Sequence, residues 1–411
     1  MSFDLVFFGG TGDLTWRKLM PSLFQAWRHG KLPRDGRILA VARDDSDDAR
    51  YRQWLQERLQ EAESAKRPTA DEFTQFSAQI HYLRMDLSVP ADYDKLKAWL
   101  NQRQADTTVM YLATSPHLFP VICQQLGACG LNHDKVRVVL EKPLGHDLAS
   151  AQDINRAVSA VFSERQALRI DHYLGKPSVQ NLMALRFGNV LFEPLWRRES
   201  IANIQITLAE SLGVGTRGDF YDRTGALRDM IQNHALQLLT MVAMEPPLSA
   251  DADAIRDEKL KVLKSLKPFD LTSVARDVVR GQYRNGMMDG KPVNGYLDAS
   301  KGPPDSHTET FVALRCEVLN QPAVKHRHPF RCCCTHFVHH SRSHGTSVSP
   351  QSLQRSGASR PTGRSSGGAA AGACFGSVFM GAPLTFDVGR LNRYRRSGPR
   401  DSSARGLQRI T

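Results

Sequence analysis

The chain has 411 residues, of which 41% are hydrophobic and 23% charged, and its formal net charge is +12 at pH 7. This composition suits a two-domain soluble protein. No apolar run approaches the roughly 20 residues that a transmembrane helix needs, and Met1 runs almost directly into the first expected strand, which leaves no room for a signal peptide. The seven cysteines suggest no disulfide framework, so we expect a cytoplasmic protein.

The positive charge lies almost wholly at the carboxyl end. Residues 321–411 hold 14 of the 54 basic side chains but only two of the 42 acidic ones, Asp387 and Asp401, which leaves 40 of each in residues 1–320. The net charge therefore describes the tail and says nothing about the partners of the rest of the chain.

The first expected strand, Leu5 to Phe8, leads directly into the turn Gly9-Gly10-Thr11-Gly12-Asp13-Leu14. A helical pattern at Leu19, Leu23 and Trp27 follows. A buried strand, a glycine turn and a helix together present backbone N–H groups and a helix N-terminus to a pyrophosphate. The Gly-x-x-Gly spacing differs from the usual dinucleotide fingerprint, so a tight turn without a ligand remains the alternative.

The second expected strand, Ile38 to Ala42, ends at Arg43. An NAD-binding chain usually places an acid there for the ribose 2′-hydroxyl, whereas an arginine suits a 2′-phosphate. The sequence therefore favours NADP as the cofactor. Asp44 and Asp45 follow directly and are either plain loop acids or a partial offset of the Arg43 charge.

Two further strands are expected at residues 107–113 and 136–140, the second ending at Glu141-Lys142-Pro143-Leu144-Gly145. Open parallel sheets bind ligands at the carboxyl ends of their strands. Lys142 is therefore well placed for the nicotinamide side of a cofactor or for a substrate, although a Glu-Lys-Pro turn is also ordinary loop chemistry.

Two stretches place ionisable groups among residues that read as buried: Arg169-Ile170-Asp171-His172-Tyr173-Leu174-Gly175-Lys176 and Arg228-Asp229-Met230-Ile231-Gln232-Asn233-His234. Buried charge is costly unless it is paired or used in chemistry. The two stretches together supply carboxylates, imidazoles, a phenol and an ammonium. These groups suit a base oriented by a carboxylate beside an anion site the size of a phosphate. A structural salt-bridge network is the alternative interpretation.

Together these stretches resemble one family, glucose-6-phosphate dehydrogenase, in order and without large gaps from residue 1 to about 319. The matching stretches are Gly9 to Leu14, Glu141 to Gly145, Arg169 to Lys176, Ala184 to Asn189, Arg228 to Gln237, Val279 to Tyr283 and Glu309 to Leu314. The resemblance implies oxidation of glucose 6-phosphate at C1 to 6-phosphogluconolactone with hydride transfer to NADP, the first step of the oxidative pentose phosphate pathway.

The resemblance also implies roles for individual residues. His234 resembles the general base and Asp171 the carboxylate that orients it. The substrate-binding residues that it implies are His172, Tyr173, Lys176, Glu210, Asp229 and Lys142. Those that it implies for the cofactor are Gly9, Gly10, Thr11, Gly12, Asp13, Leu14, Arg43, Asp86 and Lys142. No metal is expected, because hydride transfer is the chemistry of the cofactor. The family is homo-oligomeric, as a dimer or tetramer.

The implied fold has two domains. A Rossmann-type, doubly wound α/β domain that binds NADP is expected over residues 1–168. An α+β catalytic domain with a large antiparallel sheet is expected over residues 169–319, and that sheet is incomplete here because the family pattern stops. Its strands include one at Ile201–Glu210, and the helix that carries His234 is expected to end before Pro246.

Residues 320–411 match no part of the family and are rich in arginine, serine, glycine and alanine, as a shifted reading frame would produce. We expect no strand or helix there and mostly disorder. Cys332 to Cys334 with the nearby histidines could be read as a zinc site, but adjacent cysteines do not easily reach one tetrahedral ion. The arginines of residues 390–400 lack the aromatic residues of a specific nucleic-acid site. The alternative functions are a catalytically impaired relic that keeps cofactor binding, or a basic-tail binding module.

Overall fold

The structure is a computed structural model that describes residues 2–61, 67–196, 200–201, 204–209, 213–214, 218–288, 290–299, 303–320, 326–335 and 378–380. The chain forms two compact units, divided between Asp171 and His172. The sequence predicts a boundary after residue 168, close to the observed division. None of the helices in the described ranges combines the length and the apolar character of a membrane span.

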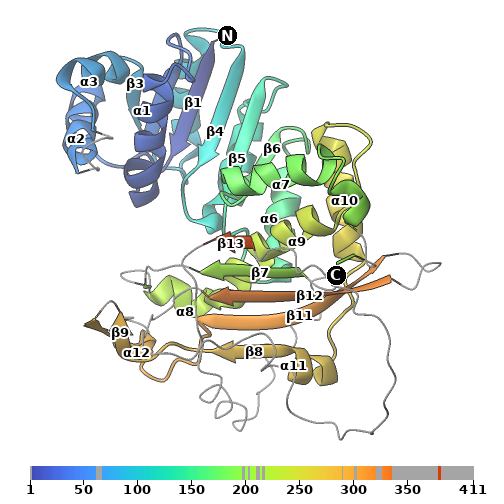
Figure 1. Ribbon diagram of the computed structural model, residues 1–411. Helices are drawn as coiled ribbons and strands as arrows, with labels where there is room; N and C mark the ends of the chain where they lie inside the picture. Colours follow the sequence, from blue (N-terminus) through green and yellow to red (C-terminus); the bar gives the residue numbers. More distant parts are fainter. Residues whose placement is uncertain are drawn as a thin grey trace, which may run out of the picture. The chain divides into compact units, whose positions relative to one another are not determined.

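The first unit is built on a parallel sheet of six strands in the order β3-β2-β1-β4-β5-β6 (Figure 1). The strands are β1 (Phe3–Phe8), β2 (Arg37–Ala42), β3 (Ile80–Arg84), β4 (Thr107–Leu112), β5 (Val136–Glu141) and β6 (Ala167–Ile170). This order is that of a doubly wound dinucleotide-binding fold. The predicted α/β class is therefore confirmed, including the four strands that the sequence located.

Helices cover both faces of this sheet. One face carries the π-helical turn η1 (Thr15–Leu19), α1 (Met20–Arg28), α2 (Asp48–Gln60) and α3 (Ala70–Ser77). The other carries α4 (Pro90–Asn101), the 3-10 turn η3 (Pro116–Leu118), α5 (Phe119–Ala128) and α6 (Leu148–Ser159). Successive residues of a strand point to opposite faces. In β1, Phe7 accordingly joins the first core, and Val6 and Phe8 join the second.

Asp4, near the start of β1, is a carboxylate whose side chain is 1% exposed. Arg37 at the start of β2 donates two hydrogen bonds to it, of 2.9 and 2.8 Å, and Arg103 donates a third of 3.1 Å. A buried carboxylate is costly unless it is paired, and bidentate guanidinium contacts are among the strongest pairings. This cluster therefore holds together the amino ends of β1 and β2 and the segment that precedes β4.

The second unit contains a sheet of five strands in the order β13-β7-β12-β11-β8 (Figure 1). The strands are β7 (Ile204–Ala209), β8 (Val278–Gly281), β11 (Phe311–Asn320), β12 (His326–Thr335) and β13 (Val378–Met380). The pairs β8–β11 and β11–β12 are antiparallel, but β12–β7 and β13–β7 are parallel. The prediction of an antiparallel sheet is therefore wrong for one half, because β12 and β13 each run in the same direction as β7.

The tail also differs from the prediction in two places. The sequence predicts no strand after residue 319, yet residues 326–335 form β12 and residues 378–380 form β13. Every β11 residue from Phe311 to Asn320 pairs with β12 in register. Backbone N–H and C=O groups of a half-buried strand need partners, and pairing depends on the backbone more than on composition. The predicted Glu210 and the rest of the tail, including the histidines after Cys334 and the residues 390–400, lie outside the described residues.

The second unit has a main apolar core and a smaller separate cluster of Val214, Tyr221 and Tyr296, and its helices contribute to one or the other or lie at the surface. The helices are α7 (Pro177–Phe187), η4 (Glu193–Leu195), α8 (Gly218–Ala226), the π-helix η6 (Leu227–Ala235), α9 (Leu236–Ala243), α10 (Ala252–Lys264), α11 (Leu271–Asp277) and α12 (Tyr296–Ala299). A small hairpin pairs β9 (Gly286–Met288) with β10 (Lys291–Val293). The helical run that carries His234 ends at Ala243, which agrees with the stop predicted from the prolines that follow.

Asp4→Ala should lower the free energy of unfolding by about 2–3 kcal/mol, because Arg37 and Arg103 lose the carboxylate that they share. Urea denaturation followed by circular dichroism measures this change. Asp106→Ala is the matched control, since Asp106 also accepts a hydrogen bond, from the Ser2 N–H at 2.8 Å, but is exposed and should tolerate the change. Equal stability of Asp4→Ala and the parent chain would contradict the role of the cluster.

Candidate active site

Two glycines fix the turn between β1 and η1. Gly9 has a φ of 93°, and a Cβ there would come within 2.7 Å of the Ala113 carbonyl oxygen. A Cβ on Gly10 would come within 2.6 Å of the Cβ of Ala40. Both glycines donate their N–H groups to the Val41 carbonyl, at 2.9 and 2.8 Å. The turn is therefore held against β2 and the end of β4, where only glycine allows so close an approach.

The remainder of the turn leads directly into a helical segment. Gly12 donates its N–H to the Gly9 carbonyl at 3.0 Å, and the Thr15 hydroxyl donates to the same oxygen at 2.9 Å. Leu14 is the residue before η1, and Asp13 forms an exposed ion pair with Arg17 at 2.7 Å. The predicted glycine stretch thus has the strand–turn–helix context that a phosphate cradle requires.

Arg43 follows β2 directly and is exposed. The two acids after it have other partners: the Thr11 hydroxyl donates to Asp44 at 2.7 Å, and Arg84 pairs with Asp45 at 2.8 Å. Asp86 follows β3, and its pKa is held below the usual range first by hydrogen bonds from Ser88 and then by the charge of Arg43. The two acids are therefore more than plain loop residues, since Asp44 accepts a hydrogen bond from Thr11 and Asp45 pairs with Arg84.

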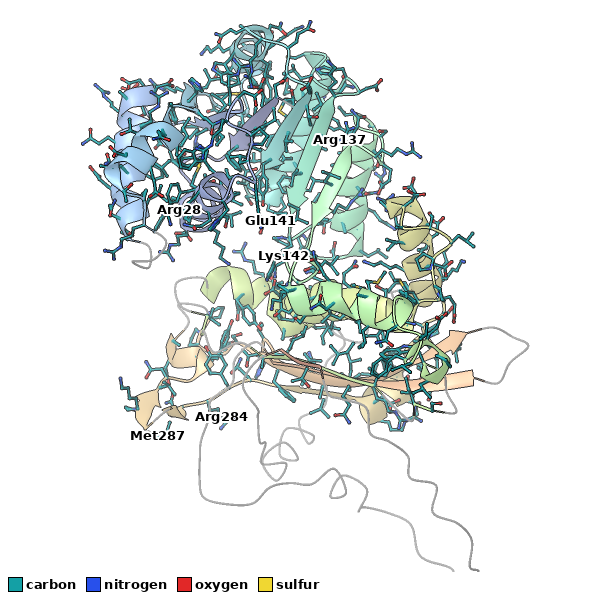
Figure 2. All side chains as sticks on the ribbon, turned by 45° about the horizontal axis from the view of Figure 1, so that its top comes forward. Arg28, Arg137, Glu141, Lys142, Arg284 and Met287 are labelled. Carbon is teal, nitrogen blue, oxygen red and sulfur yellow. The ribbon has the colours of Figure 1, made fainter. Side chains whose placement is uncertain are left out.

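Lys142 stands at the carboxyl end of β5. Figure 2 shows it beside Glu141 at one end of that strand, with Arg137 toward the other end. The Tyr111 hydroxyl donates to Glu141 at 2.6 Å, and burial together with this bond raises the pKa of Tyr111. The peptide bond from Lys142 to Pro143 is cis. Lys142 thus lies at the carboxyl end of a parallel strand, as predicted, and its role in binding stays a prediction.

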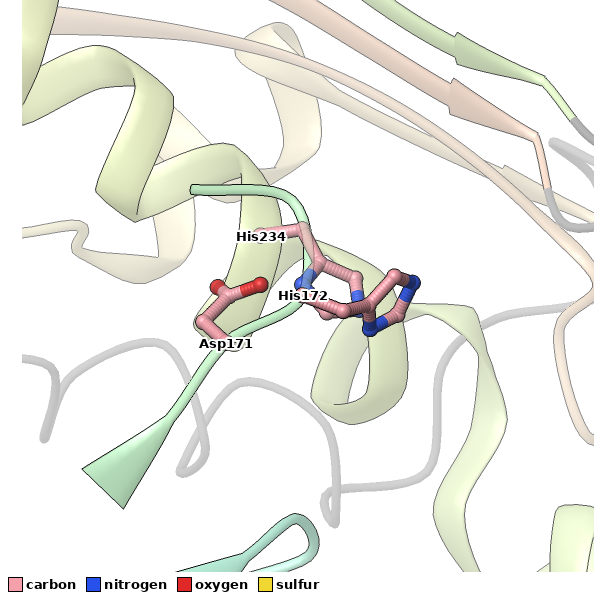
Figure 3. Close-up of side chains that lie close together, drawn as sticks. All are labelled: Asp171, His172 and His234. Carbon is pink, nitrogen blue, oxygen red and sulfur yellow. The ribbon is translucent and has the colours of Figure 1, made fainter. Parts of the chain in front are cut away.

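Asp171, His172 and His234 lie close together, as Figure 3 shows. The carboxylate and the two imidazoles offer atoms that all lie within 4.8 Å of one another. His234 is fully buried, whereas His172 is exposed. Such a group can pass a proton between a carboxylate-oriented base and a bound molecule, and two imidazoles with one carboxylate are also ligands that a transition metal accepts.

Tyr173 fixes the plane of the buried imidazole. The rings of Tyr173 and His234 stack with their centroids 4.1 Å apart and their planes 22° apart, and Tyr173 is only 2% exposed. The Lys176 ammonium lies 3.6 Å from the centroid of the Tyr173 ring. This stack places one cation and one exposed imidazole, that of His172, beside the buried base. An anion the size of a phosphate would find two donors there.

His234 and Asp229 both belong to η6, which is a π-helix rather than the α-helix that the sequence suggests. In a π-helix the backbone hydrogen bond joins residue i to residue i+5, and His234 follows Asp229 by one such step. The two side chains therefore share a face of the helix. Asn233 adds a bond from its amide to the Arg228 carbonyl at 3.0 Å. Single π-helical turns occur often at functional sites.

The helical run that continues from η6 is closed at its far end by Arg186 of α7. The guanidinium, on a side chain 5% exposed, donates to the carbonyls of Met241 and Met244 at 2.7 and 2.8 Å. Trp196 donates its indole N–H to the Val242 carbonyl at 2.8 Å. Burial lowers the pKa of Arg186 to about 10. A cation at the carboxyl end of a helix is electrostatically favoured.

The structure therefore brings the predicted Asp171, His172, Tyr173, Lys176 and His234 into one group, with Asp229 on the same helix as His234. The predicted cofactor residues gather at the strand ends of the first unit. The sequence gives no indication of the capping role of Arg186, because its carbonyl partners lie 55 and 58 residues away in sequence. The family-like stretch Ala184 to Asn189 contains it, but resemblance alone does not say what it binds.

Residues 6–181 match the family described as "Glucose-6-phosphate dehydrogenase, NAD binding domain", and residues 183–323 match "Glucose-6-phosphate dehydrogenase, C-terminal domain". The chain belongs to the glucose-6-phosphate dehydrogenase family. The family match ends at residue 323, close to the end near residue 319 that the sequence predicts.

Curated relatives support this membership. The chain is 48% identical over 321 residues to "Glucose-6-phosphate 1-dehydrogenase" of Mycolicibacterium smegmatis and 45% identical over 318 residues to that of Rhizobium meliloti. Each alignment covers 77% of this chain and 65% of the relative, so the matched part spans just under two thirds of the relatives' length.

A solved structure extends the comparison to the fold. "Glucose-6-phosphate dehydrogenase in complex with its substrate glucose-6-phosphate" superposes with a TM-score of 0.72 at 32% identity, covering 82% of this chain and 68% of that one. Both the dinucleotide unit and the catalytic unit of the family are thus represented in this chain.

Arg186→Met should lower the free energy of unfolding by about 2–3 kcal/mol, because the buried carbonyls of Met241 and Met244 lose their donors while the volume of the side chain is nearly kept. Thermal or urea denaturation measures the change. Arg256→Met is the control, since Arg256 pairs with Asp253 on the exposed surface of α10 and should tolerate the substitution. If both variants unfold like the parent chain, the cap contributes nothing.

Proposed function

We propose that this protein is an NADP-dependent glucose-6-phosphate 1-dehydrogenase that oxidises glucose 6-phosphate at C1 to 6-phosphogluconolactone. The observation that carries the proposal is the buried His234 imidazole, stacked on Tyr173 and grouped with the Asp171 carboxylate. A family relative is described as a complex with glucose 6-phosphate as its substrate. The reaction is the first step of the oxidative pentose phosphate pathway.

The glycine turn supports the cofactor assignment. Gly9 and Gly10 leave no room for a Cβ, so the turn packs closely against β2 and the end of β4 and leads directly into η1, which is the strand–turn–helix context of a pyrophosphate site. Thr11, Gly12, Asp13 and Leu14 continue the cradle into η1, and the exposed Arg43 suits the 2′-phosphate of NADP. Asp86 would lie at the adenine end. When bound, NADP supplies the acceptor for the hydride.

In the proposed mechanism His234 removes the proton of the C1 hydroxyl as the C1 hydrogen leaves as hydride, so that a C=O bond forms. Asp171 orients the imidazole and stabilises its charged form. Burial of His234 excludes water from this transfer. An imidazole is the side chain that most often serves as a general base.

The remaining residues bind the sugar phosphate. His172, Tyr173 and Lys176 would hold the phosphate, for which the exposed imidazole and the ammonium beside Tyr173 supply donors and charge. Asp229, on the face of η6 that also carries His234, would accept hydrogen bonds from sugar hydroxyls, and so would Glu210. Lys142 would act at both substrate and cofactor.

The setting of the enzyme follows from the same proposal. We assign it to the cytoplasm, which fits Cys123, Cys129 and Cys316, for which no disulfide forms among the described residues. We also expect a homo-oligomer, a dimer or tetramer. In the described sheet β8 pairs on one side with β11, and Val279 on it is 41% exposed, which suits an edge that another subunit covers.

His234→Asn should reduce kcat at least about 100-fold while keeping the fold and the affinity for glucose 6-phosphate, because a general base acts mainly in the transition state. Steady-state rates with NADP, followed by nicotinamide absorbance, measure this. His133→Asn is the control, since His133 is an exposed histidine of the first unit. Full turnover by His234→Asn would show that His234 is not the general base. A parent chain without activity would overturn the proposed function.

Arg43→Ala should raise the KM for NADP about 10-fold or more and leave the KM for NAD nearly unchanged, because the guanidinium pairs with the 2′-phosphate that only NADP carries. Parallel titrations of both cofactors measure the difference. Arg50→Ala, an exposed arginine on α2, should change neither. An equal rise in KM for both cofactors would show that Arg43 does not bind the 2′-phosphate.

A further inference from the structure

The helical run that carries Asp229 and His234 does not continue smoothly from α8. Gly225 interrupts it with a φ of 69° and a ψ of 170°, and helical geometry resumes at Ala226. A new helix start leaves its first backbone N–H groups without partners inside the helix. Ala226 is 0% exposed and Leu227 6% exposed, so water is a poor substitute there.

Glu309, which precedes β11, supplies acceptors for the N–H groups of Ala226 and Leu227. Its backbone carbonyl accepts the Ala226 N–H at 3.0 Å, and its carboxylate oxygen Oε1 accepts the Leu227 N–H at 3.1 Å. A carboxylate at the amino end of a helix also interacts favourably with the helix dipole. One residue from a distant part of the chain thus caps the helix start twice, once through its main chain and once through its side chain.

The position of Glu309 is itself fixed from several sides. The Tyr221 hydroxyl donates to its carbonyl at 3.3 Å, and an Arg280 guanidinium nitrogen lies 3.7 Å from Oε2. The next residue, Thr310, is fully buried and donates its N–H to the Gly281 carbonyl at 2.8 Å. The sheet pairing of β8 with β11 therefore sets where the carboxylate lies, and the helix start must meet it there.

Gly225 shows how closely the two parts fit. A Cβ on this residue would come within 2.5 Å of Glu309 Oε1, and its φ lies in the region that side chains rarely adopt. A glycine is therefore required both for the bend and for the approach of the carboxylate.

We infer that Glu309 is a positioning residue that sets the helix carrying Asp229 and His234 against the sheet of the second unit. Asp229 lies in the first turn after the capped residues, whereas His234 lies further along and is stacked on Tyr173. Loss of the cap therefore displaces Asp229 more than His234. This part of the inference rests on the proposed function, in which Asp229 binds the sugar.

Kinetics of two substitutions test the role. Glu309→Ala should raise the KM for glucose 6-phosphate about 10-fold or more, with a smaller loss of kcat and an unchanged KM for NADP. Glu309→Gln keeps an oxygen acceptor for Leu227 and should restore the KM to within about threefold of the parent value. Glu317→Ala is the matched control, a glutamate within β11 that pairs with Lys267 and should leave all constants unchanged.

Hydrogen exchange of the backbone amides, measured on the full chain, supplies a readout that does not depend on turnover. Glu309→Ala should speed exchange from Ala226 through His234, and Glu309→Gln should not. Faster exchange confined to Ala226 and Leu227, or normal kinetics in Glu309→Ala, would overturn the positioning role. If the parent chain is inactive but exchange responds as expected, the proposed function has failed and the positioning of the helix by Glu309 stands.

Discussion

The second unit depends on one helical run, from Ala226 to Ala243, that is buried along most of its length and cannot satisfy its own ends. Glu309 supplies acceptors at its start, and Arg186 supplies donors at its finish. Both partners come from outside the run: Glu309 precedes β11, and Arg186 belongs to α7. A buried helix end without partners would cost more than the run gains from one additional apolar contact. The two caps therefore determine where Asp229 and His234 lie, because both residues stand between them in the helical run.

The first unit depends on a different constraint, the close packing of the turn after β1 against its parallel sheet. Its central strands β1, β2, β4 and β5 are buried on both faces, and the turn after β1 packs so closely against β2 and the end of β4 that Gly9 and Gly10 admit no side chain. Charged groups stay at the rim, where Thr11 engages Asp44 and Arg84 engages Asp45. The Asp4 cluster closes the opposite, amino ends of the strands. The Asp4 cluster and the glycine turn thus lie at opposite ends of the strands of one sheet, and in the proposed function only the end with the turn binds the cofactor.

The sequence predicts the elements that have a local apolar pattern, and it does not predict the contacts between residues far apart in the chain. The strands β1, β2, β4 and β5 are continuous apolar runs at the centre of a parallel sheet and were located from sequence. The edge strands β3 and β6 are not predicted. In β6, Leu168 and Ile170 are 45% and 38% exposed and alternate with Arg169, so this strand lacks the continuous apolar run of the central ones. The π-helical form of η6 and the Glu309 cap also escaped prediction. The cap joins residues 82 apart in sequence, and no local pattern reports such a pairing.

The tail shows that strand pairing depends less on the identity of the side chains than ligand binding does. The family match ends at residue 323, yet β12 begins at His326 and completes the ladder between β7 and β11. Strand pairing requires backbone N–H and C=O groups, which most residues supply. Pro329 lacks the N–H, and it stands opposite Glu317 but just outside the ladder with β7, which starts at Phe330. A stretch of unrelated composition can therefore satisfy the backbone of a sheet, whereas binding a sugar phosphate requires particular side chains at particular positions.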